Sequence, residues 1–409
     1  MLRIALAGLL LSLPQEPAPV ELHFLMWKPH QREAWTRALR DFENLHPRIR
    51  VRVEEGPHSS SELHAMLVTK LRARDPELDL FLIDVVWPAE FAAAGYLDPI
   101  DDLFSEEERK RFFPGPIEAD TVDGRLVAAP FNVDAGLLYF RKDLVKAAPE
   151  TWNQLAEQAA AITARHPDLF GYTGQFDRYE GLVCNLMELI RSNGGRMAPS
   201  LDERAEEAVA WARDRLIGPV APRAVLNQRE TESREIFLQG HAVFHRNWPE
   251  TWKIANDPAR SKVAGRVGLA PLPRFEGGRS VSTLGGWQLA IASHSPRRAE
   301  ARALVRYLAG FDVQKRLTLE TSHGPSLSAV MDDPDVLARF PHFAEMKRVF
   351  FAAEPRPRSP DYAELSDRLQ QTLYAKLTGA EDGVAVLPAL APMAVLGLLV
   401  FYLSRGRRA

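Results

Sequence analysis

The sequence predicts an α/β fold, in which strands and helices alternate along the chain. Three observations in the first 90 residues support this prediction. Residues 22–27 form a short apolar run typical of a strand, and residues 33–45 carry apolar side chains at helical spacing. Residues 80–83 form a continuous apolar run that ends at Asp84, as expected for a central strand of a parallel sheet. Layered α/β folds are built from this alternation.

The segments between and after these three follow the same pattern. Ile49, Val51 and Val53 alternate as in a half-buried strand, and Ser59 with Glu62 has the spacing of a capping box at the start of a helix. Further strands are expected at 126–129, 136–140, 242–245, 267–270 and 286–292, with Pro130-Phe131-Asn132 between the first two, and further helices at 152–165, 179–191, 297–308 and 362–376.

Length and composition restrict the classes of protein to which this chain can belong. About 365 residues lie between two apolar ends, which is too many for one ordinary core and suits two lobes. The 51 basic and 54 acidic residues nearly balance, which argues against a nucleic-acid-binding protein. Cys184 is the only cysteine, so we expect a buried free thiol, with no disulfide within the chain and no thiolate metal cluster.

The sequence contains no recognisable catalytic signature. It has no nucleophile elbow, zinc-protease helix, phosphate-binding loop or dinucleotide-binding glycine pattern. His241 and His245 have helical spacing but lie in an expected turn and strand, so we do not expect them to hold a metal. Asp84 and Asp134 could form a carboxylate pair that hydrolyses a glycoside, although the sequence does not give their separation.

The C-terminal segment predicts a membrane helix. Residues 383–404 carry no charge, and this length is enough to cross the hydrocarbon core. Glu381 and Asp382 precede the span, and three arginines lie in residues 405–409. The positive-inside bias therefore places this tail in the cytoplasm and the rest of the chain outside. The alternative is a buried core helix, since two prolines lie within the run.

The N-terminus predicts a signal peptide over residues 1–19. A short positive start precedes the ten apolar residues 4–13, and Pro14 to Pro17 then break the run. Ten residues are too few to span a bilayer. The sequence has no clear cleavage site, so a cleaved signal and an uncleaved anchor both remain open.

Five short polar and aromatic clusters lie at the ends of expected strands or in loops. In open α/β sheets, ligands bind beyond the carboxyl ends of strands. A sugar needs flat aromatic rings for its C–H faces, and carboxylates or amides for its hydroxyls. The clusters contain both: Asp84 with Trp87, Asn132 with Asp134, Gln175 with Tyr179 and Glu180, Asn247 with Trp248, and Gly285 with Gly286 and Trp287. Gly286 would let the backbone approach a ligand closely.

Each of these residues also has a purely structural interpretation. Trp87 could pack its own loop, Trp248 could cover one face of a lobe, and Asp84 could cap the next helix. Tyr179 could be a helix-packing aromatic. The co-occurrence of the clusters, and no single residue, favours a binding site. Trp35 and Trp152 are assigned to the core.

The clusters occur within longer stretches that resemble the family 1 extracellular solute-binding proteins of ABC importers, nearest to the trehalose/maltose-binding branch. These stretches run in the order of the family from about residue 22 to 380, and they include DLFLIDVVWPAEFAAAGYLDPIDD, DGRLVAAPFNVDAGLLYFRKDL, YEGLVCNLMELIRSNGG, FHRNWPETW and SVSTLGGWQLAIASHS.

The resemblance implies a type II periplasmic-binding-protein fold, with two lobes joined by a hinge and a sugar held between them. The first lobe would comprise residues 20–130 and 286–325, and the second 131–285 and 326–380. The residues that match sugar-contacting positions are Asp84, Asp134, Tyr179, Trp248, Gly286 and Trp287, to which we add Trp87, Asn132 and Glu180 from the same clusters.

One loop departs from the family pattern. Lys28-Pro29-His30-Gln31 replaces the small or acidic residues that are common there. The cations Lys28 and His30 would favour a more electronegative or phosphorylated glycan, although a solvated loop explains them equally well.

The resemblance implies a monomeric receptor without cofactor or metal. It would bind a carbohydrate and dock on permease subunits that work with a separate ATPase subunit, anchored in the cell membrane by residues 383–404 with the receptor facing the periplasm or exterior. The stretch 387–390 also resembles the first membrane helix of maltose-type permeases, which suggests a receptor–permease fusion as the origin of this span. Three alternatives remain: a membrane-anchored glycoside hydrolase, a sugar-sensing ectodomain and a scaffold that has lost its ligand.

Overall fold

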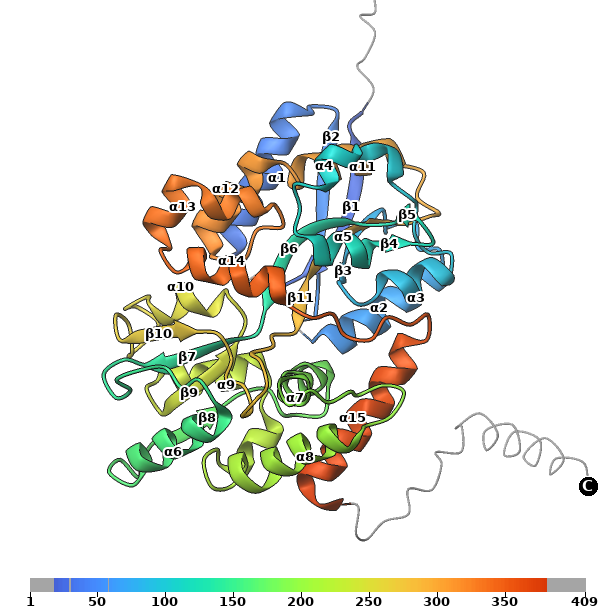
Figure 1. Cartoon of the computed structure of the whole chain (residues 1–409). Coiled ribbons are helices and arrows are strands. Elements are labelled where there is room, and N and C mark those ends of the chain that lie inside the picture. Colours follow the sequence, from blue (N-terminus) through green and yellow to red (C-terminus); the bar gives the residue numbers. More distant parts are fainter. Residues whose placement is uncertain (1–17, 29–30, 58, 381–409) are drawn as a thin grey trace, which may run out of the picture.

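The computed structural model describes residues 18–28, 31–57 and 59–380 (Figure 1). The predicted signal peptide up to residue 17, Pro29 and His30 of the departing loop, the predicted membrane span 383–404 and the tail 405–409 lie outside the described residues. Within the described ranges, no helix is both long enough and apolar enough to cross a bilayer.

Two separate sheets organise the chain. The first has five strands in the order β2-β1-β3-β11-β6, and the second has four in the order β10-β7-β9-β8. The strands are β1 (Val20–Trp27), β2 (Ile49–Gly56), β3 (Leu80–Asp84), β4 (Thr121–Val122), β5 (Arg125–Leu126), β6 (Ala129–Ala135), β7 (Leu137–Arg141), β8 (Phe170–Thr173), β9 (Ala242–Asn247), β10 (Val267–Ala270) and β11 (Leu284–Ile291).

Fifteen α-helices surround these sheets in the described part of the chain. They are α1 (Arg32–Leu45), α2 (Ser60–Arg72), α3 (Pro88–Ala93), α4 (Glu106–Arg109), α5 (Pro114–Asp120), α6 (Trp152–Thr163), α7 (Glu180–Ser192), α8 (Glu203–Trp211), α9 (Glu230–Leu238), α10 (Thr251–Ala255), α11 (Arg298–Leu308), α12 (Phe311–Thr321), α13 (Pro334–Arg339), α14 (Phe343–Ala352) and α15 (Tyr362–Thr378).

Residues of the first sheet are buried on both faces, as the continuous apolar run of β3 predicts. On β1, Phe24 and Met26 pack in one core cluster with α1, whereas Leu25 packs in another with α2. The sheet is mixed rather than wholly parallel: β1 is parallel to β2 and β3, and β11 is antiparallel to both of its neighbours. The α/β fold class is therefore confirmed, and β3 is the middle strand of five.

Two predicted helix starts are present, each with a capping side chain just before the helix. The Ser59 hydroxyl accepts a hydrogen bond from the backbone N–H of Glu62 at 3.5 Å, and Thr151 accepts one from Gln154 at 3.2 Å. These bonds satisfy backbone donors that the first turn of a helix leaves free. The start of each helix therefore follows from a local signal.

The prediction around residues 126–140 is wrong in one respect. Pro130-Phe131-Asn132 does not separate two strands but lies inside β6, and Leu126 belongs to the short hairpin of β4 and β5. A proline disfavours a central strand because it has no N–H to donate. β6 is the edge strand of its sheet, so the missing donor at Pro130 is tolerated.

Three chain segments cross between the two sheets and lie together near their junction (Figure 1). The first is the short step from β6 to β7 at Gly136. The second leads into β11, and the third contains Glu354: the N–H of Leu284 donates to the Glu354 carbonyl at 2.7 Å, and the N–H of Glu354 donates to the Ser282 carbonyl at 2.9 Å. The second and third segments are thus hydrogen-bonded to each other where the chain passes from one sheet to the other.

Candidate functional site

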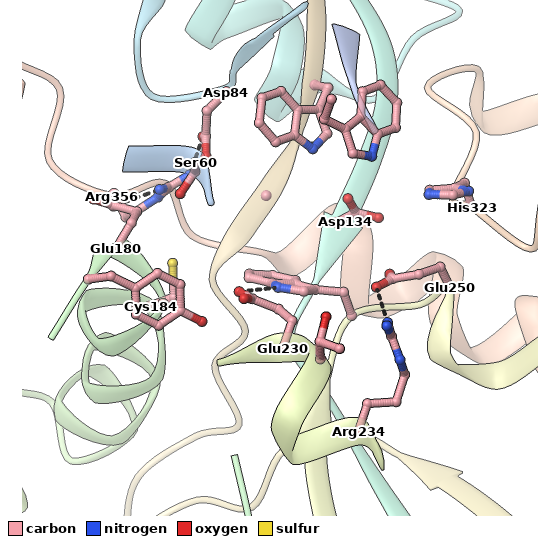
Figure 2. Close-up of a pocket in the computed structure, with 18 residues that line it drawn as sticks. Ser60, Asp84, Asp134, Glu180, Cys184, Glu230, Arg234, Glu250, His323 and Arg356 are labelled. Carbon is pink, nitrogen blue, oxygen red and sulfur yellow. Dashed lines mark hydrogen bonds and ion pairs between the residues drawn. The ribbon is translucent and has the colours of Figure 1, made fainter. Parts of the chain in front are cut away.

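A pocket lies between the two sheets and is lined from both sides (Figure 2). It has about 930 Å³ of empty space, part of it open to solvent. Of the nine residues that the sequence predicts, seven line it: Asp84, Asp134, Tyr179, Glu180, Trp248, Gly286 and Trp287. Trp87 lines a neighbouring pocket. Asn132 does not line the first pocket, but its side-chain amide donates a hydrogen bond to Asp134.

Two tryptophans from the first sheet form an aromatic wall of the pocket. The rings of Trp27 and Trp287 are parallel, with centroids 5.5 Å apart and 3° between their planes. Trp87 meets Trp287 edge-on at 5.8 Å. Aromatic rings can stack on the apolar C–H face of a sugar, so this wall is suited to a carbohydrate.

Trp248 lines the pocket from the second sheet, where it follows β9. One face of its ring is covered by the Arg246 guanidinium at 4.0 Å, and its indole N–H donates to Glu230 at 3.4 Å. Arg246 is itself fixed by a buried ion pair with Glu188. The Trp248 ring is therefore held in one orientation before any ligand binds.

Gly286 also has a packing role that was not predicted. Its φ of +122° is a conformation that side chains rarely adopt, and an added Cβ would lie 2.2 Å from the carbonyl oxygen of Asn132 on β6. At Gly285, an added Cβ would lie 3.1 Å from the Trp248 ring. Both glycines therefore allow close packing around the pocket wall.

Arg356 joins two predicted site residues that lie on different sides of the pocket. Its guanidinium donates to the carboxylate of Asp84, at the end of β3, and to that of Glu180, at the start of α7, the latter at 2.7 Å. Arg356 is 3% exposed. Burial raises the pKa of Asp84, and the Arg356 charge opposes that rise. The Asp84 carboxylate also accepts a hydrogen bond from the backbone N–H of Val86, and this bond closes a local turn after β3.

The carboxylate of Glu180 is occupied by donors from its own chain. Besides Arg356, the Tyr362 hydroxyl donates to it at 2.5 Å and the Ser366 hydroxyl donates at 2.5 Å. Both hydroxyls belong to α15. Glu180 lines the pocket, but its main contribution is to fix α15 and Arg356 against α7.

Asp134 offers the pocket a free acceptor. One carboxylate oxygen accepts a hydrogen bond from the Asn132 amide at 2.9 Å, and the other is buried without a partner among the described residues. Burial raises the pKa of Asp134 well above its usual range, and the nearby charge of Glu250 raises it further. An unpartnered buried oxygen is costly, so a ligand hydroxyl that donates to it would gain a strong hydrogen bond.

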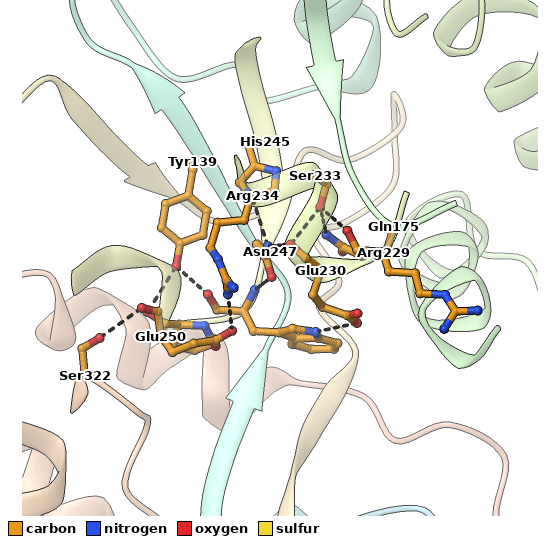
Figure 3. Close-up of polar contacts among 12 residues, drawn as sticks. Tyr139, Gln175, Arg229, Glu230, Ser233, Arg234, His245, Asn247, Glu250 and Ser322 are labelled. Atoms are coloured by element: carbon orange, nitrogen blue, oxygen red, sulfur yellow. Dashed lines mark hydrogen bonds and ion pairs between the residues drawn. The ribbon is translucent and has the colours of Figure 1, made fainter. Parts of the chain in front are cut away.

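Glu250 faces the pocket from the second sheet and forms an ion pair with Arg234 at 3.6 Å (Figure 3). Burial raises the pKa of Glu250. Tyr139 holds the segment between β9 and Glu250, because its hydroxyl donates a hydrogen bond to the carbonyl of Trp248 at 2.8 Å.

Three helices begin at the pocket. Ser60 of α2, Gly181 of α7 and Thr231 of α9 all line it, and each lies in the first turn of its helix. The N-terminus of a helix carries a partial positive charge. These termini partly offset the five carboxylates of the site and provide backbone N–H donors near a ligand.

His323 and Cys184 also line the pocket. Burial lowers the pKa of His323 to about 4, so the imidazole is neutral at pH 7. Burial raises the pKa of the Cys184 thiol, and the predicted buried free thiol is confirmed. Neither residue adds a charge at neutral pH.

Several lining residues were missed by the sequence analysis. Trp27 carried a usable signal, because it ends β1, the strand beside β3, and the same rule that indicated Asp84 applies to it. Glu250 carried a signal as well, because it lies in the stretch FHRNWPETW two residues after Trp248. Glu230 and Arg356 carried none, since no motif or strand end marks them. Their positions depend on the packing of distant segments.

No group of three or more metal-ligating side chains is present in the part of the chain that the structure describes. His245 is buried in β9, where its ring contacts the Thr173 carbonyl at 3.3 Å and the Asn247 amide at 3.0 Å. It is a core histidine with two polar partners.

Comparisons with known proteins agree with this geometry. The model of a family described as bacterial extracellular solute-binding protein matches residues 28–315. A probable ABC transporter-binding protein of Deinococcus radiodurans is 37% identical over 347 residues, which are 80% of this chain and 82% of that protein. A maltotriose-binding protein of Pyrococcus abyssi is 24% identical over 323 residues, which are 76% of this chain and 67% of that protein.

Among solved structures, maltose-bound MalE3 of T. maritima superposes with a TM-score of 0.83 and 35% identity, covering 88% of this chain and 95% of that one. The fold is therefore the α/β type II periplasmic-binding-protein fold, as the sequence resemblance implied.

Proposed function

This chain belongs to the bacterial extracellular solute-binding protein family, and we propose that it captures a neutral oligosaccharide of the maltose or trehalose kind for an ABC importer. The observation that carries the proposal is the pairing of the Trp27–Trp287 wall with the unpartnered oxygen of Asp134 in one pocket. The rings suit the C–H faces of a sugar, and the oxygen suits a hydroxyl. MalE3, which is 35% identical, was solved with maltose.

The charge of the pocket favours a neutral ligand. Five carboxylates line it: Asp84, Asp134, Glu180, Glu230 and Glu250. Two guanidiniums, those of Arg234 and Arg356, line it as well. Both guanidiniums already pair with carboxylates of the pocket, Arg234 with Glu250, and Arg356 with Asp84 and Glu180. The phosphorylated ligand suggested by Lys28 and His30 is therefore the less favoured candidate.

The family consists of binding proteins and not of enzymes, which argues against the hydrolase alternative.

In this proposal the two sheets belong to lobes that close on the sugar, as hinged domains do. The predicted lobes, 20–130 with 286–325 and 131–285 with 326–380, are retained with three adjustments. Residues 326–353 are moved to the first lobe, because α13 packs on α12, α14 packs on β6, and the chain crosses to the second sheet only at Glu354. β6 continues in the first sheet to Ala135, and β11 joins that sheet from Leu284. The closed form then docks on permease subunits, and a separate ATPase subunit drives transfer.

We further propose that residues 383–404 anchor the receptor in the cell membrane, with the binding lobes outside. The support is the uncharged run and the arginines that follow it. An anchor of this kind holds the receptor at a high effective concentration beside a membrane partner.

A thermal-shift screen of the full-length protein against maltose, trehalose, maltotriose and mannitol tests the proposal. A ligand that binds only the folded state raises the melting temperature. A saturable rise with a glucose oligosaccharide, followed by a calorimetric Kd, is the expected result. If no sugar changes the melting temperature, the scaffold alternative, a cleft without a ligand, is favoured.

A further inference from the structure

An ion pair joins the two halves of the molecule beside the pocket. Glu62 lies in the first turn of α2, which packs on the first sheet. Arg229 immediately precedes α9, which packs on the second sheet and whose residues Glu230 and Thr231 line the pocket. A guanidinium nitrogen of Arg229 lies 3.5 Å from a carboxylate oxygen of Glu62. The pair therefore connects α2 of the first half with α9 of the second.

Contacts within the second half hold Arg229 in place. Its guanidinium donates a hydrogen bond to the Asp177 carboxylate at 2.6 Å and lies over the ring of Tyr179, 5.0 Å from the ring centroid. Tyr179 is buried and lines the pocket. Figure 3 shows the Arg229 side chain at the outer edge of the polar cluster, away from Glu250. A cation that is already fixed loses little conformational entropy when it pairs, so Arg229 is ready to receive Glu62.

Both members of the pair are accessible to solvent. The side chain of Glu62 is 63% exposed and that of Arg229 is 38% exposed. An exposed pair of this kind contributes little to the free energy of unfolding. It acts on the arrangement of the halves instead, because Glu62 and Arg229 come together only when the halves are close. If the halves separate, Arg229 keeps its contacts with Asp177 and Tyr179, whereas Glu62 loses its cation.

We propose that Glu62 and Arg229 form a latch, which is made when the halves close on the sugar and which lengthens the time that the sugar stays bound. The inference rests on the proposed function, because it needs a ligand that the halves enclose. A contact that exists only in the closed form shifts the equilibrium toward that form. The sugar enters before the latch is made, so the latch slows dissociation and leaves association unchanged.

The test is to measure both rate constants of the full-length protein by stopped-flow tryptophan fluorescence with maltose, trehalose, maltotriose and mannitol. Glu62→Gln removes the charge but keeps the backbone N–H that donates to Ser59. For each sugar that binds, its dissociation rate constant should be about two- to fivefold higher than that of the unmodified protein, with the same association rate constant. Glu62→Lys should raise dissociation further, because it places two cations together.

Ionic strength gives a second measurement. The sugar carries no charge, so salt affects its dissociation through charges of the protein that meet on closure. Raising the salt concentration from about 0.01 M to about 1 M shortens the Debye length from about 30 Å to about 3 Å. This change should speed dissociation from the unmodified protein by about twofold or more, and it should have less effect on Glu62→Gln.

Glu364→Gln is the matched control, since it removes one charge from an exposed ion pair with Arg368 that lies within α15. It should leave both rate constants and their salt dependence unchanged. In an Arg229→Gln background, Glu62→Gln should have no further effect, because the partner cation is already absent.

Two results would overturn the latch while leaving the proposed function intact. One is a sugar that binds but dissociates equally fast from the unmodified protein and from Glu62→Gln. The other is an effect of Glu62→Gln that persists in the Arg229→Gln background. If none of the four sugars binds, both proposals fail.

Discussion

The indole of Trp27, at the end of β1, lies parallel to the indole of Trp287 on β11, with ring centroids 5.5 Å apart. β3 separates the two strands in the sheet, so the rings meet by reaching over its carboxyl end. Offset parallel rings stabilise each other by about 0.5–1.5 kcal/mol beyond their burial. Each ring therefore fixes the other in the wall of the pocket.

Replacement of Trp287 by alanine should weaken sugar binding by about 1–3 kcal/mol, because it removes a ring that can stack on the sugar and frees Trp27 to move. Calorimetry with the sugar found by the thermal-shift screen measures the change. Trp287→Phe should retain part of the affinity, since a flat ring remains. Unchanged affinity in a folded Trp287→Ala protein would exclude this ring from the site.

Asp134→Asn should weaken sugar binding by about 0.5–3 kcal/mol, the range that hydrogen bonds to neutral and to charged groups contribute. The melting temperature should not fall, because burial and the nearby charge of Glu250 already disfavour an ionised carboxylate at this position, and an amide of the same shape carries no such cost. Asp120→Asn is a suitable control: Asp120 is also fully buried, both its oxygens lack partners among the described residues, and it does not line the pocket. Weaker binding in the Asp120 variant as well would point to a general effect on the fold.

Arg356→Met should lower the free energy of unfolding by about 3–5 kcal/mol, because it leaves the buried carboxylates of Asp84 and Glu180 without their shared cation. Urea denaturation followed by circular dichroism measures this loss. Arg358→Met removes a cation two residues away that pairs with the exposed Glu118 at 3.5 Å, and should cost no more than about 1 kcal/mol. Similar losses in the two variants would contradict the bridging role of Arg356.

His342→Phe should make the stability of the protein less sensitive to acid. Burial against the Trp252 ring, whose centroid lies 4.1 Å from that of His342, lowers the pKa of His342 to about 4. Between pH 6.5 and 4 the unfolded chain binds a proton at this residue and the folded chain does not, so the free energy of unfolding falls as the pH falls.

Removal of the imidazole should recover about 1–3 kcal/mol of that decline at pH 4, relative to pH 7. Denaturation midpoints measured at both pH values give the difference. His166→Phe, at an exposed histidine, should leave the decline unchanged. An identical pH dependence in the unmodified protein and the His342 variant would show that His342 does not cause it.

The predicted membrane span is tested by extraction. Full-length protein should remain in the membrane pellet at alkaline pH, because residues 383–404 are uncharged and long enough to cross a bilayer. A chain that ends at Ala380 should appear in the soluble fraction. Retention of the shortened chain in the pellet would require a different anchor.

The sequence predicted those parts of the fold that depend on local signals. β3, α2 and α6 follow from an apolar run or from a capping side chain that bonds within its own first turn. β6 was misread because the tolerance of Pro130 depends on its place at the edge of the sheet, which is a property of topology. No pattern in the sequence records which strand becomes an edge.

In the site, too, the residues marked by local signals were predicted, and those placed by distant packing were not. Asp84 and Trp248 were found because each ends or follows a strand, and Trp287 because it lies in the first half of β11, opposite Asp84. Arg356 was missed because it lies in a segment without regular structure, and its importance comes from two carboxylates that are distant in sequence. The packing role of Gly286 was not predicted either, because its close contact is with β6, a strand that is distant in sequence.

The position of β11 between β3 and β6 has a consequence for biosynthesis. The first sheet cannot be completed until residue 291 has been synthesised. The strand that pairs with both β3 and β6 follows β6 after about 150 residues and β3 after about 200. Contacts of such long sequence separation form slowly. A nascent chain that cannot close its first sheet early stays unfolded for longer, and an unfolded chain is the form that a protein-translocating channel can thread across a membrane.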